Sequence, residues 1–332
     1  MEVSAQTQVP VIDISGLSGG RDSKLDVARA IGKACREVGF FYASGHGVSV
    51  ELQEKMMALS QLFFAQSHEI KMRIAMAKGG RAWRGFFPVG MELTAGLPDI
   101  KEGIYFGQEL SDKHPAVLVG KPMHGANLFP EEPRDLRDVV LTYMNEITAL
   151  GHALMGALSL SLGLEESYFH DRYTKDPLLL FRIFHYPAPT VKQQQLWGVG
   201  EHTDYGVLTI LKQDDCGGLE VKTKAGWVAA PPIENTFVCN IGDMLDRMTG
   251  GLYKSTPHRV RNASGRNRLS FPFFFDPGFD TLVQPLPVVD RDTITDDSQE
   301  RWDKANVHAV SGTYGEYILE KVRKVFPDGP ID

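Results

Sequence analysis

The spacing of apolar residues changes near Leu178 from a helical to a strand-like rhythm. Before that point, apolar residues mostly recur every three or four positions, as they do on the buried face of an amphipathic helix. Gly39 and Ser49 stand where a C-terminal cap and an N-cap are expected. The elements predicted for this half include helices over 22–38 and 49–65 and strands over 9–14 and 40–44.

The longest helical pattern runs from about Pro133 to Leu162. Its apolar stripe consists of Leu136, Val140, Met144, Ile147, Leu150, Leu154 and Leu158. At about 1.5 Å per residue, such a helix spans about 45 Å. We therefore predict one long helix that braces a whole domain.

Beyond Leu178, short apolar segments follow one another, with Gly, Pro, Asn or Asp in most of the gaps. These segments read LLLFRIFHY, VLTIL, LEV, WVAA, FVCNI, HRV and LSFPFFF. Such a rhythm is typical of an antiparallel barrel or sandwich. Residues 312–326 return to helical spacing. The pattern predicts an α+β fold in which a helical N-terminal half packs on a C-terminal β-domain.

A chain of 332 residues is longer than the usual single domain, but a β-barrel can exceed that size. We therefore expect one large domain with additions at both ends. The predicted segments are an N-terminal α/β region over 1–130, the long bracing helix and its connection over 131–177, a β-core over 178–285, and a C-terminal segment with a helix over 286–332.

Composition and charge exclude several classes of protein. A net charge of −7 argues against a general attraction to nucleic acid. No apolar run approaches the roughly 20 residues that cross a bilayer, and the polar N-terminus lacks a signal-peptide profile. Cys35, Cys216 and Cys239 form neither a disulfide framework nor a zinc pattern, which fits a reducing compartment. We expect a monomeric cytoplasmic protein with no membrane or nucleic-acid partner.

The segment 201–206 (EHTDYG) carries a candidate metal site. In an extended chain, His202 and Asp204 project on one face and Thr203 on the other. His258, on a later predicted strand, offers a third ligand because an antiparallel barrel brings distant strands together. Two imidazoles and one carboxylate form the facial triad of non-haem Fe(II) oxygenases, which leaves three coordination positions open. Taken alone, the His-x-Asp pair is more often a surface or capping pair.

A second feature follows His258 in the sequence. Arg268 and Ser270 share one face of the strand predicted over 269–275. A guanidinium binds a carboxylate through two parallel hydrogen bonds, and a neighbouring hydroxyl adds another. A carboxylate receptor beside an open iron suits 2-oxoglutarate, whereas for Arg268 taken alone a structural ion pair is the favoured interpretation. The remaining histidines are interpreted as structural or solvated: His46, His68, His114, His124, His152, His170, His185 and His308.

Taken together, these features resemble the 2-oxoglutarate/Fe(II) oxygenases of the isopenicillin N synthase-like superfamily, whose pattern is His-x-Asp, a distant His, then Arg-x-Ser. The segments VPVIDIS, GFFYASGHGV and FRIFHYP also resemble that family's motifs, so the resemblance covers nearly the whole chain. By this resemblance, residues 178–285 form a double-stranded β-helix, or jelly roll.

The resemblance implies an enzyme that binds Fe(II) and consumes O₂ and 2-oxoglutarate. Such an enzyme releases succinate and CO₂ while it oxidises, most often hydroxylates, a small molecule. Arg268 and Ser270 would hold the far carboxylate of 2-oxoglutarate. Two alternatives stay open: an oxidase like isopenicillin N synthase that does not use 2-oxoglutarate, and a non-catalytic small-molecule binder on the same fold.

Two segments resemble the bacterial ethylene-forming enzymes and the plant homoarginine hydroxylases: the HTDYG form of the metal motif and MELTAG at 91–96. In those relatives, an arginine-type amino acid is held by the positions that match Glu92, Thr94, Arg182 and Tyr205. A carboxylate for a guanidinium and an Arg for an α-carboxylate is sensible chemistry. Alternatively, Glu92 is a solvated loop residue, and Arg182 pairs with Asp204 or another acid.

The segment 105–107 departs from both of these relatives. Phe106, together with Trp83, Phe86 and Phe87, is a candidate wall of an aromatic-lined substrate pocket. Aromatic side chains are more often simply core or interface residues. Both interpretations stay open at this point.

Overall fold

The computed structural model describes residues 8–325 except 95, 191–195, 290–295, 297 and 300. Its helices are α1 (Arg21–Glu37), α2 (Val50–Phe64), α3 (His68–Lys71), α4 (Pro115–Leu118), α5 (Leu136–Ser161), α6 (Asp243–Met248) and α7 (Tyr314–Val325). Its strands are β1 (Val11–Asp13), β2 (Phe40–Ser44), β3 (Gly85–Phe87), β4 (Leu93–Thr94), β5 (Leu97–Pro98), β6 (Glu102–Gly107), β7 (Leu178–Tyr186), β8 (Val199–His202), β9 (Leu208–Gln213), β10 (Leu219–Thr223), β11 (Gly226–Ala229), β12 (Phe237–Ile241), β13 (His258–Val260) and β14 (Arg268–Asp276).

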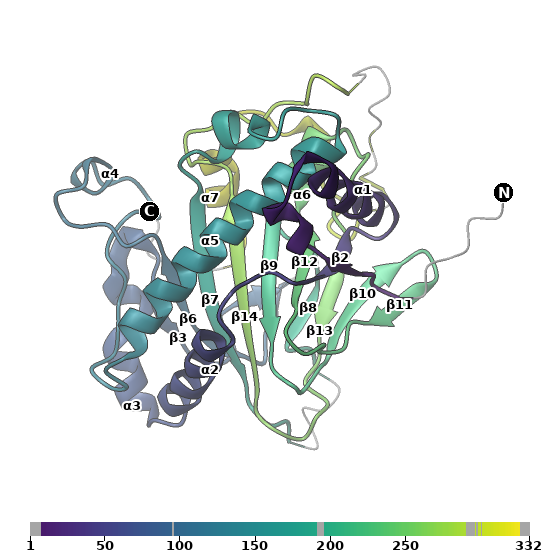
Figure 1. Ribbon diagram of the computed structural model, residues 1–332. Helices are drawn as coiled ribbons and strands as arrows, with labels where there is room; N and C mark the ends of the chain where they lie inside the picture. The colour runs from purple at the N-terminus through teal and green to yellow at the C-terminus, as the bar shows by residue number, and fades with distance from the viewer. Residues whose placement is uncertain are drawn as a thin grey trace.

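Two sheets form the β-core (Figure 1). The larger sheet has the strand order β1-β2-β12-β9-β14-β7-β6-β3, and the smaller has the order β11-β10-β13-β8. Apart from the parallel pair β1–β2, the paired strands run antiparallel. A cavity of about 430 Å³ is lined by residues of both sheets. The architecture is a jelly roll with added helices, and the predicted α+β fold is confirmed.

Successive side chains along the central strands of the larger sheet point to opposite faces. One face lines the cavity, and the other packs in the hydrophobic core. On β14, the cavity face carries Arg268, Ser270, Pro272, Phe274 and Asp276. The core face of the same strand carries Leu269, Phe271, Phe273 and Phe275. A slip of one residue would exchange the two sets. The register that pairs Arg268 with Tyr186 of β7 therefore keeps the polar residues in the cavity.

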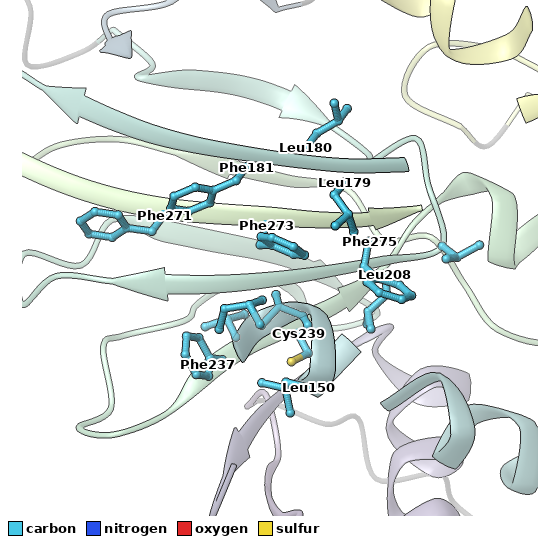
Figure 2. Packing of buried hydrophobic residues seen from close by; sticks show 14 of the residues in the cluster. Leu150, Leu179, Leu180, Phe181, Leu208, Phe237, Cys239, Phe271, Phe273 and Phe275 are labelled. Carbon is cyan, nitrogen blue, oxygen red and sulfur yellow. The ribbon is translucent and has the colours of Figure 1, made fainter. Parts of the chain in front are cut away.

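Helix α5 crosses the core face of the larger sheet (Figure 1). Figure 2 shows Phe273 and Phe275 on the side of the sheet where Leu150 of this helix lies, while Leu180 projects from the opposite side. The helix approaches closely at Gly151, where a Cβ would lie 2.5 Å from the Phe275 ring. Burial of each such aromatic side chain stabilises the fold by about 1.5–3 kcal/mol.

The predicted long helix is confirmed as α5, although it begins at Leu136 rather than near Pro133. Residues 134 and 135 form a turn before its first residue. The helix predicted over 312–326 is α7. The apolar segments predicted as strands beyond Leu178 correspond to β7 and to β9 through β14.

Strand β6 was not predicted from the sequence. All of its residues are buried, so both of its faces are covered and no alternation marks it. Strands β1, β2, β3 and β6 come from the first 130 residues but extend the larger sheet. The division of the chain at 130, 177 and 285 stays a prediction. Within the described residues, no helix is long and apolar enough to cross a membrane.

Candidate metal centre and active-site cavity

Three side chains converge at the cavity end of the smaller sheet. His202 is the last residue of β8, His258 is the first residue of β13, and the two lie opposite each other in the ladder. Their ring centroids are 4.2 Å apart. Asp204 Oδ1 lies 3.9 Å from His202 Nε2 and 3.7 Å from His258 Nε2. The three possible ligand atoms therefore surround one point, at separations that suit a shared cation.

The outer nitrogen of each imidazole is held by a backbone carbonyl. His202 Nδ1 lies 2.8 Å from the Gly200 oxygen, and His258 Nδ1 lies 3.1 Å from the Thr256 oxygen. A proton on Nδ1 donates to that oxygen and leaves Nε2 free to bind a metal. Burial, reinforced by the neighbouring His202, lowers the pKa of His258 to about 4. The neutral, metal-binding form of this ring is thus favoured at neutral pH.

The carboxylate of Asp204 is fixed from its far side. Its Oδ2 accepts hydrogen bonds from Thr209 Oγ1 at 2.6 Å and Asn240 Nδ2 at 2.7 Å. Burial alone would raise the pKa of Asp204, but the two histidines and these hydrogen bonds hold it below its usual value. Neither donor was predicted from the sequence. Their signal is a polar residue between two apolar neighbours on a strand: Thr209 between Leu208 and Ile210, and Asn240 between Cys239 and Ile241.

The guanidinium of Arg268 is fully buried at the cavity. Its Nε donates to the Gly217 oxygen at 2.6 Å, and its Nη2 lies 3.4 Å from Gln213 Oε1. Within the described part of the chain, its buried Nη1 has no hydrogen-bond partner. Ser270 Oγ lies 3.5 Å from the Tyr186 hydroxyl, a cavity residue that sequence analysis missed. An unpaired guanidinium N–H beside two hydroxyls fits one end of a dicarboxylate such as 2-oxoglutarate.

The structure brings most of the predicted substrate residues into the same cavity. Its lining includes Glu92, Thr94, Arg182 and Tyr205 together with the convergent triad. Trp83 also lines it, as do Phe274 and Trp302, which the sequence did not indicate.

Phe106 is not brought to the cavity. Its ring stacks on Phe129 at 5.1 Å and on Phe181 at 6.1 Å in the hydrophobic core. The reason is register: Phe106 lies opposite Phe181, so both side chains point to the core face, whereas Tyr105 lies opposite Arg182. Phe86 and Phe87 also belong to the core.

Glu92 is buried and is not a solvated loop residue. Its Oε2 lies 2.8 Å from Lys101 Nζ, and its Oε1 lies 3.5 Å from Arg182 Nη1. Lys101 pairs in addition with Asp99, which accepts a hydrogen bond from Thr94 at 2.8 Å. The acid partner of Arg182 is therefore Glu92 rather than Asp204.

The C-terminal segment closes one side of the cavity. Trp302 Nε1 donates to Thr203 Oγ1 at 3.0 Å, and this threonine stands between the first two members of the triad. Arg301 Nη2 donates to Asp243 Oδ1 at 2.6 Å. The backbone N–H of Asp243 in turn donates to the Asp204 carbonyl at 2.8 Å. These contacts tie the segment to the backbone that carries Asp204.

His185 is a structural residue. Its Nδ1 lies 2.8 Å from Glu102 Oε1, and its ring stacks on Phe64 with centroids 4.9 Å apart. Lys71 completes this buried cluster, with its Nζ 2.8 Å from Glu102 Oε2.

Comparison with known proteins agrees with this geometry. The family described as non-haem dioxygenase in morphine synthesis N-terminal matches residues 9–132, and the 2OG-Fe(II) oxygenase superfamily matches residues 177–277. A probable iron/ascorbate oxidoreductase of Dictyostelium discoideum is 49% identical over 97% of this chain and 95% of its own. A homoarginine-6-hydroxylase of Glycine max is 34% identical over 97% of this chain and 98% of its own.

A solved structure shares the same architecture. The Neurospora crassa protein T7H, in complex with α-ketoglutarate (2-oxoglutarate) and thymine, matches with a TM-score of 0.79 and 27% identity. The match covers 95% of this chain and 96% of that one.

Proposed function

The chain belongs to the 2-oxoglutarate and Fe(II)-dependent oxygenase superfamily, and we propose that His202, Asp204 and His258 hold its iron. Arg268 and Ser270 then anchor the far carboxylate of its 2-oxoglutarate. The enzyme is a 2-oxoglutarate-dependent non-haem iron dioxygenase that acts on a small molecule. We propose hydroxylation as the outcome of that oxidation.

One observation carries the residue assignment. A carboxylate oxygen of Asp204 lies within 3.9 Å of two imidazole Nε2 atoms, in the same cavity as the unpaired Nη1 of the buried Arg268. A cation satisfies the first arrangement, and a carboxylate satisfies the second. Bound Fe(II) supplies the activation of O₂ at the positions that the triad leaves open.

The protein residues contribute orientation and exclusion of water. The carbonyls of Gly200 and Thr256 fix the two rings, and Asn240 holds the free oxygen of Asp204. Arg268 and Ser270 set the position of the dicarboxylate along the cavity. Aromatic side chains on the lining, with Trp302 from the C-terminal segment, shield the reacting groups from solvent.

The substrate is proposed to lie beside Arg182 and Tyr205, in the same cavity as the proposed metal triad. The relatives indicate two chemical directions. The Glycine max relative is named for homoarginine, which carries a guanidinium. The T7H structure instead holds thymine, which is neutral and carries carbonyl groups.

The test measures succinate formed per O₂ consumed, by purified enzyme supplied with Fe(II), 2-oxoglutarate and a substrate panel. We expect equal amounts of the two, with one oxygen atom added to the substrate by mass spectrometry. Consumption of O₂ without any consumption of 2-oxoglutarate would favour the oxidase alternative. Failure to bind Fe(II) in a titration would favour the non-catalytic binder.

We also propose a monomer that works in the cytoplasm. Cys35, Cys216 and Cys239 are all free thiols, as a reducing compartment allows. Burial raises the pKa of Cys35 to about 12, so this thiol stays protonated and unreactive. Size-exclusion chromatography with light scattering tests the monomer, and imaging of a tagged protein tests the compartment.

A further inference from the structure

We propose that the cavity binds its substrate through an oxygen acceptor, a carbonyl or a carboxylate, held by Arg182. A substrate that would place a cationic group on Glu92 is rejected, because Lys101 already occupies that position. This inference rests on the proposed function, since it concerns the substrate of the same cavity. It departs from the arginine-type amino acid that the sequence resemblance implies.

Lys101 is the protein's own cationic partner for two buried carboxylates, those of Glu92 and Asp99. Its side chain is only 1% exposed, and its Nζ lies 2.8 Å from Glu92 Oε2. The same ammonium pairs with Asp99 and lies 4.9 Å from the centroid of the Phe184 ring. Two carboxylates and an aromatic face satisfy this buried charge in place. The ammonium is therefore fixed where a ligand cation would otherwise bind.

Both oxygens of Glu92 already face an internal cation, although Oε2 makes no hydrogen bond of good geometry within the described residues. Its second oxygen lies 3.5 Å from Arg182 Nη1, so the carboxylate stands between two internal cations. Two cations, Lys101 and Arg182, face two carboxylates, those of Glu92 and Asp99. A substrate guanidinium would add a third positive charge to this buried group or displace one of its members. Either event is unfavourable where solvent screening is weak.

Arg182 offers the complementary group. Its Nη1 donates to the Tyr105 hydroxyl at 2.9 Å, while its buried Nε has no hydrogen-bond partner in the part of the chain that the structure describes. A buried donor of this kind is satisfied by a ligand oxygen. Its guanidinium carbon lies 5.1 Å from the Trp83 ring and 4.9 Å from the Phe274 ring, and both rings line the cavity. A flat, largely apolar molecule with an oxygen acceptor at one edge matches this surface.

Binding without turnover tests the proposal directly. The holoenzyme with Fe(II) and 2-oxoglutarate, under exclusion of O₂, is titrated by calorimetry with thymine, phenylacetate and L-homoarginine. L-Homocitrulline, in which a neutral urea replaces the guanidinium, is the matched control for charge. We expect thymine or phenylacetate to bind at least about tenfold more tightly than L-homoarginine, a difference of about 1.4 kcal/mol. We also expect L-homocitrulline to bind no more weakly than L-homoarginine.

Two outcomes overturn the proposal. One is that L-homoarginine binds most tightly and clearly better than L-homocitrulline; the other is that neither thymine nor phenylacetate binds. The same preparation is assayed for succinate released from 2-oxoglutarate without substrate. If succinate forms but the titrated compounds do not bind as expected, only the substrate class is rejected. If succinate does not form either, the proposed function is rejected as well.

Two variants separate the roles of the charged residues, with folding checked by circular dichroism. Lys101→Met removes the ammonium at similar length and should raise the affinity for L-homoarginine about tenfold or more, because Glu92 becomes available. Glu92→Gln frees Arg182 from its internal partner and should tighten phenylacetate binding severalfold. If Glu92→Gln instead weakened phenylacetate and thymine, or if folded Lys101→Met gained no affinity for L-homoarginine, the proposal would be wrong.

Discussion

At the scale of single residues, each proposed metal ligand is held by a hydrogen-bond partner on the side that faces away from the proposed metal site. Backbone carbonyls hold the two histidines, and Asn240 with Thr209 holds Asp204. Such partners orient a ligand and tune its basicity. Their contribution to metal binding can be measured separately from that of the ligands.

Asn240→Ala is expected to weaken Fe(II) binding about 10- to 100-fold, because Asp204 Oδ2 loses one of its donors while the three ligands stay in place. Fe(II) titration without O₂ measures the change. Asn145→Ala, on the exposed surface of α5, is the matched control and should bind iron as the wild type does. An unchanged iron affinity in Asn240→Ala would mean that Thr209 alone suffices to hold the carboxylate.

Arg268→Ala should raise the KM for 2-oxoglutarate roughly 100-fold, since a buried charge-assisted pair is worth about 2–5 kcal/mol on removal of one partner. Iron binding should persist, because Arg268 is not a ligand. Asp204→Ala or His202→Ala should instead abolish turnover through loss of the metal. If Arg268→Ala kept the wild-type KM, the carboxylate anchor would lie elsewhere in the cavity.

At the scale of elements, the turn after β8 is shaped by its contacts with α6 and β14. The carbonyls of Asp204 and Gly206 accept hydrogen bonds from the N–H groups of Asp243 and Met244 at the start of α6. On the other side, a Cβ at Gly206 would lie 1.4 Å from Asp276 Oδ1. The turn therefore has no room for a larger residue.

Gly206→Ala is expected to destabilise the protein by about 1–3 kcal/mol, the usual cost of overpacking. Because the shift falls within two residues of Asp204, Fe(II) affinity should fall as well. Denaturant unfolding and Fe(II) titration measure the two effects. Gly20→Ala is the control for a Cβ added without a clash, since its φ is −73° and nothing lies within 4 Å of the added Cβ. Because Gly20 is the N-cap of α1, this control should lose only the small capping contribution and keep its Fe(II) affinity. Equal stability of Gly206→Ala and Gly20→Ala would show that Asp276 moves aside freely.

The elements with a strong hydrophobic periodicity were predictable from the sequence. So was the convergence of His202, Asp204, His258, Arg268 and Ser270 on one cavity, whereas their proposed roles stay a prediction. The spacing of residues along one strand shows which of them share a face, whereas contacts between strands depend on the register in which the strands pair. Asn240 was missed for that reason, because it acts on Asp204, which lies far away in the sequence. Lys101 was missed because the hairpin of β4 and β5, which the spacing did not predict, brings it back to Glu92. Phe106 was proposed for the cavity, but the pairing of β6 with β7 turns it to the core.

At the scale of the whole molecule, the site couples the two sheets with the C-terminal segment. The proposed iron ligands lie at the end of the smaller sheet, and the proposed 2-oxoglutarate anchor lies on the larger one. Trp302 and Arg301 connect the final segment to the same region. Ligands bound between these parts should therefore stabilise the entire fold and not only a loop.

Fe(II) together with 2-oxoglutarate, each at about 100 times its Kd without O₂, should stabilise the native state by at least about 2.7 kcal/mol. The melting temperature, measured by differential scanning calorimetry, should rise by several degrees. In Asp204→Ala the rise should be absent, while in Arg268→Ala the part due to Fe(II) should remain. A rise in wild type that chelation of the metal does not reverse would contradict the assigned site.

The placement of Lys101 also has an evolutionary consequence. Its ammonium takes the place of a ligand charge, and it is held by Glu92 and Asp99 rather than by the proposed iron ligands or the proposed dicarboxylate anchor. A single codon change at this position would alter which substrates are admitted while the reactive centre stayed intact. Descendants of one scaffold could thus diverge between charged and neutral metabolites in one step, without passing through an inactive ancestor.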